Sequence, residues 1–138
     1  MRSLTKLDLS GDSGGPFGGC GPMSIRALPE RFGDLINLQT LSLRECRSLQ
    51  LLPDGFGGLK NLKDLDLYEC RSLPALPKGF TDLKKLEKLN MGWCKGLVSL
   101  PERFGQLRSL VHLDLSQCFA LKELPAGIPP STAPAFLT

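Results

Sequence analysis

The chain has 138 residues, of which 41% are hydrophobic but only 7% aromatic, and its formal net charge is +3. This length suits one domain, and the dispersed, nearly balanced charge excludes the basic footprint of a nucleic-acid-binding protein. No apolar run approaches the roughly eighteen residues that cross a bilayer, and the charged N-terminus argues against a signal peptide. We therefore expect a cytoplasmic or nuclear protein with no nucleic-acid or membrane partner.

The N-terminal segment opens with a short apolar pattern. Leu4, Leu7 and Leu9 follow L-x-x-L-x-L, and the last two alternate with polar residues as in a half-buried strand. Residues 11–22 follow, with six glycines and two prolines, which predicts a loop inserted into this first unit. The apolar pattern resumes at Ile25 and closes at Leu35.

The same pattern then returns every 24 residues. The motif L-x-x-L-x-L opens at Leu38, Leu62, Leu86 and Leu110. A cysteine follows each motif, at Cys46, Cys70, Cys94 and Cys118. The unit reads LxxLxLxxCxxLxxLPxxFgxLxx, and the first unit fits it once the glycine-rich insert is set aside. The sequence therefore predicts five coils of a repeat that start near residues 4, 38, 62, 86 and 110, in a domain of residues 1–128.

These coils predict an α/β solenoid. Strands that return once per coil pair in parallel, about 4.8 Å apart. The Leu-Pro pair keeps the leucine extended and removes a backbone donor, so short helical turns are expected opposite the strands, at 30–35, 80–85 and 103–107. Leucines and phenylalanines should stack on their counterparts in neighbouring coils. We expect a right-handed, horseshoe-shaped arc with about five strands of about seven residues on its concave face, followed by a proline-rich tail at 129–138.

The four repeated cysteines predict buried, reduced thiols that bond the backbone of the adjacent turn. Their spacing, without any C-x-x-C pair, does not match a zinc site, so we expect no metal and no other cofactor. Cys20, in the glycine-rich insert, is the thiol expected to be exposed.

Residues 11–16, GDSGGP, are identical to the hexapeptide around the nucleophile of trypsin-like proteases. That chemistry requires a general base and an orienting carboxylate beside the serine, here Ser13. The single histidine, His112, belongs to the fifth coil, about 19 Å from the first at the usual strand spacing. A serine protease is therefore only a remote alternative, and we assign no catalytic residue.

Polar residues between the strand leucines should point onto the concave face. The central position forms a ladder of Asp8, Ser42, Asp66, Asn90 and Asp114. Because like charges on neighbouring strands repel, such a ladder favours a basic partner, although a merely solvated face is the commoner explanation.

Tyr68 and Trp93 are the only tyrosine and tryptophan, and neither occupies a core position. Together with Arg44 they are typical interface anchors, although Trp93 could instead pack over the strand end against the next turn. The predicted partner-binding residues are Arg44, Glu45, Asp66, Tyr68, Glu69, Asn90, Trp93, His112 and Asp114. The expected face of roughly 450 Å² is smaller than the roughly 800 Å² of a stable interface, so edges or loops should contribute.

The unit is identified as a leucine-rich repeat. Its 24-residue length, its cysteine and LPxxFGxL resemble the repeats of plant-type intracellular immune receptors, and LPxxxGxL is shared with Ras-associated scaffold repeats. The resemblance covers about residues 1–128 and implies a protein-binding scaffold, with defence or stress signalling as its setting. No nucleotide-binding loop GxxxxGK[ST] is present, so switching by ATP or GTP is not expected.

We therefore expect a recognition module that binds a protein partner and carries out no chemistry. The alternative is self-association into a homo-oligomer through the first strand, because no polar cap precedes Leu4.

Overall fold

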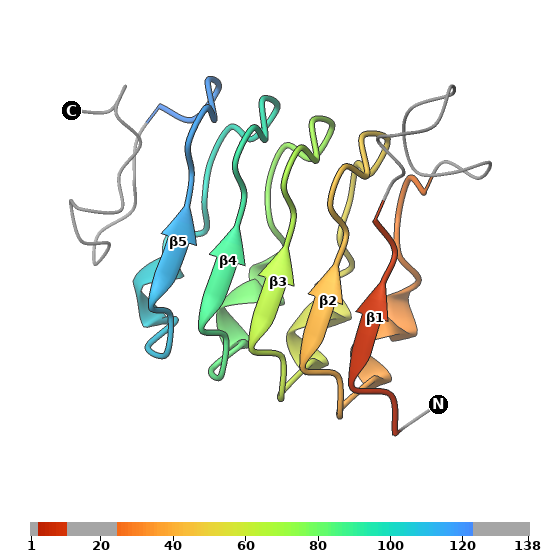
Figure 1. The fold of residues 1–138 in the computed structure, drawn as a ribbon. Coiled ribbons are helices and arrows are strands. Elements are labelled where there is room, and N and C mark those ends of the chain that lie inside the picture. Colours follow the sequence, from red (N-terminus) through yellow and green to blue (C-terminus); the bar gives the residue numbers. More distant parts are fainter. Residues whose placement is uncertain (1–2, 11–24, 123–138) are drawn as a thin grey trace.

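The computed structural model describes residues 3–10 and 25–122, which form a stack of five coils (Figure 1). Each coil contributes one strand: β1 (Lys6–Asp8), β2 (Thr40–Ser42), β3 (Asp64–Asp66), β4 (Lys88–Asn90) and β5 (His112–Asp114). The strands form one parallel sheet in the order β1-β2-β3-β4-β5. The predicted sheet is confirmed. The insert at 11–22, with Ser13 and Cys20, and the tail at 129–138 lie outside the described residues, so the domain boundaries stay a prediction.

The register follows the 24-residue period. One interior row runs through all five strands and consists of Leu7, Leu41, Leu65, Leu89 and Leu113. Leu41 and Leu65 are fully buried, since each is covered by a coil on both sides. Stacking of equivalent residues therefore forms the core, as expected for a solenoid.

The strands are shorter than the sequence predicted. Each has three residues rather than about seven, because the chain turns soon after the strand. The turn contains a residue in the left-handed region in four successive coils: Glu45 (φ 63°), Glu69 (φ 59°), Trp93 (φ 58°) and Gln117 (φ 60°). Backbone bonds between coils continue into this turn, as between the N–H of Glu45 and the carbonyl of Tyr68 (2.6 Å).

Short 3-10 helices lie on the other side of the coils, behind the sheet in Figure 1. They are η1 (Glu30–Asp34), η2 (Asp54–Gly58), η3 (Lys78–Asp82) and η4 (Phe104–Gln106). The proline of the Leu-Pro pair starts the first three, since Pro29, Pro53 and Pro77 have φ between −65° and −70° and an extended ψ. The helical turn expected at 80–85 therefore begins at Lys78 instead.

The phenylalanines of the repeat form a continuous stack inside the helical side. Ring centroids are 6.2 Å apart for Phe32 and Phe56, 5.9 Å for Phe56 and Phe80, and 6.4 Å for Phe80 and Phe104. The planes are within 8° of parallel. The prediction that these side chains point inward and stack is confirmed.

Glycine lets the helical turns of neighbouring coils touch through their backbones. A Cβ at Gly57 would lie 2.2 Å from the carbonyl oxygen of Gly79, and one at Gly33 would lie 1.8 Å from that of Gly55. Thr81 occupies this position in the next coil, and η4, which follows it in the stack, has three residues instead of five. Where Thr81 replaces the glycine, the contact between η3 and η4 is looser than the contact between η2 and η3.

The repeated cysteines form a ladder of thiol hydrogen bonds. Each Sγ donates to the carbonyl oxygen of the strand end in the preceding coil: Cys46 to Leu9 (3.2 Å), Cys70 to Leu43 (3.2 Å), Cys94 to Leu67 (3.1 Å) and Cys118 to Met91 (3.0 Å). All four thiols are buried. Burial raises the pKa of Cys94 to about 12 and that of Cys118 to about 11, so these thiols stay protonated at neutral pH. The predicted environment of the repeated cysteines is confirmed.

Candidate partner-binding face and rim

The central ladder of the sheet face has a local structural role. In each coil, the side-chain oxygen of the ladder residue accepts a hydrogen bond from the backbone N–H of the residue two positions later in the sequence. The acceptors are Asp8, Ser42, Asp66, Asn90 and Asp114, at 2.8–3.4 Å. Hydrogen bonds from the side chain and backbone of Ser10 lower the pKa of Asp8. These contacts are Asx and Ser/Thr turns, which explain why short polar side chains recur there without invoking a basic partner.

The turn that follows each strand forms an edge that we call the rim, residues 44–47, 68–71, 92–95 and 116–119. Arg44 begins it in the second coil. Its guanidinium carbon lies 4.1 Å from the ring centroid of Tyr68, and its Nη1 lies 3.2 Å from Oδ2 of Asp66. Three of the predicted partner-binding residues therefore form one cluster, in which Tyr68 is half-buried.

The next part of the rim is ionic. Glu69 accepts hydrogen bonds from Nη2 of Arg47 (2.9 Å) and Nη2 of Arg71 (3.1 Å). Only 13% of the Glu69 side chain is exposed, and the bond from Arg47 is the main reason why the pKa of Glu69 falls below its usual value. One carboxylate thus neutralises cations from two coils.

The aromatic residues of the fourth and fifth coils occupy the same edge. The rings of Trp93 and Phe119 meet edge to face, with centroids 6.0 Å apart, and Nζ of Lys95 lies 5.2 Å from the Trp93 centroid. Trp93 is half-buried, so it does pack over the strand end against the next turn. Phe119 nevertheless remains 57% exposed.

Gly92 separates the two clusters. A Cβ there would lie 3.1 Å from Cδ2 of Tyr68 and 3.3 Å from Oγ of Ser116. The missing side chain therefore leaves room for the Tyr68 ring beside the fourth coil.

The remaining predicted residues are more dispersed. Asn90 and Asp114 belong to the central ladder, Glu45 lies in the turn of the second coil, and His112 is exposed on β5 opposite Lys88. The sequence prediction missed Arg47, Arg71, Lys95 and Phe119. These four residues share one position of the repeat, immediately after the cysteine. A comparison of that position between coils could have identified them from the sequence.

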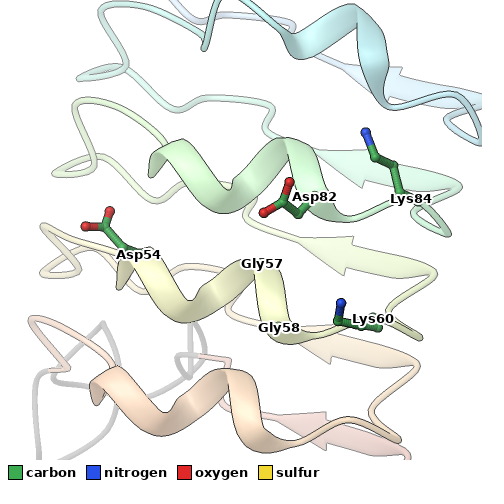
Figure 2. Close-up of a pocket in the computed structure, with 6 residues that line it drawn as sticks. All are labelled: Asp54, Gly57, Gly58, Lys60, Asp82 and Lys84. Atoms are coloured by element: carbon green, nitrogen blue, oxygen red, sulfur yellow. The ribbon is translucent and has the colours of Figure 1, made fainter.

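A hollow lies on the helical side and is lined by Asp54, Gly57, Gly58, Lys60, Asp82 and Lys84. Figure 2 shows that Lys60 and Lys84 follow the ends of η2 and η3, on the same side of the stack. It lies where the turns lack side chains at Gly57 and Gly58, and its charges alternate in sign. This hollow shows no grouping of functional side chains.

Within residues 3–10 and 25–122, no three His, Cys, Asp or Glu residues are grouped as a metal site would require. Nor does any helix there combine the length and apolar character needed to cross a bilayer.

Comparison with known proteins agrees with this geometry. The leucine-rich repeat family profile matches residues 32–95. A leucine-rich repeat protein of Leptospira interrogans has a similar structure, with 30% identity and a TM-score of 0.52, over 90% of this chain and 34% of that one. The chain folds as a leucine-rich repeat solenoid. No curated protein matches its sequence significantly.

Two other solved structures are similar to the chain over most of its length. The leucine-rich repeat domain of a type III effector is 24% identical, with a TM-score of 0.45, over 81% of this chain and 58% of that one. A plant peptide hormone receptor, solved in a complex, is 20% identical with a TM-score of 0.46, over 91% of this chain and 24% of that one. The chain therefore spans about a third of the first of these three structures and just over half of the second.

Proposed function

We propose that this leucine-rich repeat chain is a recognition module that binds a protein partner through its sheet face and rim and catalyses no reaction. Solenoids of this kind generally use an extended face for protein–protein interaction. The observation that carries the proposal is the cluster of Arg44 on Tyr68 beside Asp66, since arginine and tyrosine are the residues most enriched at binding hot spots.

The cellular setting forms part of the same proposal. We place the module in the cytoplasm or nucleus, in defence or stress signalling. Support comes from the resemblance of the 24-residue unit to repeats of intracellular immune receptors and from its buried, protonated thiols, which suit a reducing compartment.

Affinity capture with single variants tests the binding face. The tagged chain is compared with Tyr68→Ala and with Lys88→Glu, which reverses an exposed charge on β4. The control is Lys84→Glu, an identical change on the helical side, and circular dichroism verifies that each variant folds. We expect the captured partner to fall at least tenfold for the first two and to stay unchanged for the control. Unchanged capture by both sheet-face variants contradicts the proposal.

Self-association is a second candidate, favoured by one observation. Leu4, Leu7 and Leu9 are only partly buried, whereas Leu38 and Leu41 at the equivalent positions of the second coil are fully buried. β1 is an edge strand of the described sheet, and an unpaired strand edge can accept a strand from a second copy. Light scattering across a hundredfold concentration range tests this candidate: a constant monomer mass rejects it, and a dimer that Leu7→Lys dissociates supports it.

A further inference from the structure

The rim changes character between its two halves. The ionic half consists of Arg47, Glu69 and Arg71, and the aromatic half of Trp93, Lys95 and Phe119. In the ionic half a carboxylate neutralises the cations. In the aromatic half Trp93 stands at the repeat position of Glu69, and Phe119 stands where earlier coils have a cation.

Lys95 is the cation affected by this change. Arg71, at the same repeat position one coil earlier, binds the carboxylate two residues before it, whereas Lys95 has an indole ring there. Among the described residues no carboxylate lies within 4.0 Å of the Lys95 ammonium. A carboxylate from another molecule could therefore replace the missing partner while the ring still contacts the lysine stem.

Trp93 and Phe119 supply an apolar surface next to this ammonium. Phe119 is 57% exposed, and its ring stands edge to face against the half-buried ring of Trp93. A large aromatic pair at an edge is unusual for a surface that only faces water, and aromatic side chains lose little conformational entropy when a partner covers them.

The backbone holds this surface in place. Trp93 has φ 58°, a conformation that bulky residues seldom adopt, and its N–H donates to the carbonyl of Ser116 (2.8 Å). The Cys94 thiol fixes the following residue to Leu67 of the preceding coil. The turn that carries Trp93 is thus tied to the coils on both sides before any partner arrives, which lowers the entropy cost of binding.

The size of the sheet face also argues for a contribution from the rim. Five strands of three residues span about 10 by 20 Å, or roughly 200 Å², at standard strand spacings. A stable interface needs about 800 Å² from each partner. A partner on this face must therefore extend over an edge, and the aromatic half of the rim adjoins β4 and β5.

We propose that Trp93, Lys95 and Phe119 form a docking site for a partner segment that carries a carboxylate next to an apolar side chain. This inference rests on the proposed function and specifies the chemistry of its partner. Lys95 binds the carboxylate, and the two rings cover the apolar side chain.

A random dodecapeptide library displayed on phage and selected on the immobilised full chain tests the docking site. Selected peptides should be enriched in Asp or Glu beside Leu, Ile or Phe. The tightest peptide is then synthesised, and its affinity is measured by calorimetry and by the fluorescence of Trp93, the single tryptophan. Enrichment of Lys and Arg instead of acidic residues would overturn the proposed chemistry.

Matched variants locate the bound peptide. Trp93→Gly removes the ring and leaves a residue suited to the left-handed turn. The control is Ile36→Ser, which removes an exposed apolar side chain just after η1 and away from the rim. We expect Trp93→Gly and Phe119→Ser each to weaken binding at least tenfold, and Ile36→Ser to leave it unchanged. Amidation of the peptide carboxylate should weaken binding to wild type but have no effect on Lys95→Met.

The outcomes separate the two proposals. If the rim variants bind normally while Lys88→Glu loses the peptide, the docking site is wrong and the sheet-face function stands. If the library gives no binder, or the binder tolerates every variant on the sheet face and rim, both proposals are wrong.

Discussion

The interior of the solenoid and its rim are built from the same 24-residue unit, yet only the interior keeps its residue types from coil to coil. The leucines of the strands and the phenylalanines stack on their counterparts in neighbouring coils, so a change in one coil would disturb the coils beside it. The rim holds an ion cluster in the second and third coils and an aromatic pair in the fourth and fifth. Positions whose residue type is not constrained by stacking can therefore differ from coil to coil, and these positions are available for contacts with a partner.

The largest expected effect concerns the phenylalanine stack. Phe80 contacts a ring on each side, whereas Phe104 has a stacked ring on one side in the described part of the chain. We expect Phe80→Ala to lower the free energy of unfolding by about 3–5 kcal/mol, and Phe104→Ala by less. Urea unfolding followed by circular dichroism measures both. An equal or larger loss for Phe104→Ala would show that contacts between coils do not dominate the core.

A glycine substitution tests how closely the helical turns pack. We expect Gly57→Ala to lower the free energy of unfolding by about 1–3 kcal/mol, because the new Cβ meets a backbone oxygen that cannot move independently. Gly105→Ala is the matched control, since Gly105 is exposed within η4 and should gain a few tenths of a kcal/mol or stay neutral. Thermal melts of the two variants decide the point, and a destabilised Gly105→Ala would contradict this account.

The central ladder should give a smaller effect. Oδ1 of Asp114 accepts the N–H and the hydroxyl of Ser116 at 2.8 and 2.6 Å. Asp114→Ala removes this turn and should cost about 1 kcal/mol in the free energy of unfolding, while Asp114→Asn keeps the acceptor and should cost less than half of that. If alanine and asparagine have equal effects in urea unfolding, the ladder has no structural role and the hypothesis of a basic partner returns.

The ionic half of the rim should respond weakly to pH. The pKa of Glu69 lies below its usual 4.5 in the folded chain, so its ion pairs stabilise the fold above pH 4.5 and are lost as pH falls through the folded value. Glu69→Gln should therefore show a shallower loss of melting temperature than wild type below pH 4.5. Glu102→Gln, an exposed change on the helical side, serves as the control. Parallel curves for wild type and Glu69→Gln would exclude this contribution.

The sequence predicted the interior well for a physical reason. A period of 24 residues places Leu41 beside Leu65 in any parallel stack, and a buried cysteine after the strand has only the neighbouring backbone to bond. Strand length was wrong because the left-handed turn at Glu45 and its equivalents carries no glycine or asparagine to reveal it.

The rim was predicted less completely. Arg44 and Tyr68 were chosen as single residues, and their stacking needed the turn geometry. Phe119 was missed because its hydrophobic side chain suggests burial, while Arg47 and Arg71 suggested only solvated charges. Comparing one repeat position across coils would have found the change from cation to phenylalanine.

One variant tests most directly whether the rim carries recognition independently of the fold. Trp93→Glu combined with Lys95→Arg gives the fourth coil the rim residues of the second and third. Titration calorimetry with the selected acidic peptide should show that binding is lost, while the melting temperature stays within a few degrees of wild type. Peptide binding at wild-type affinity by this folded double variant would contradict the account.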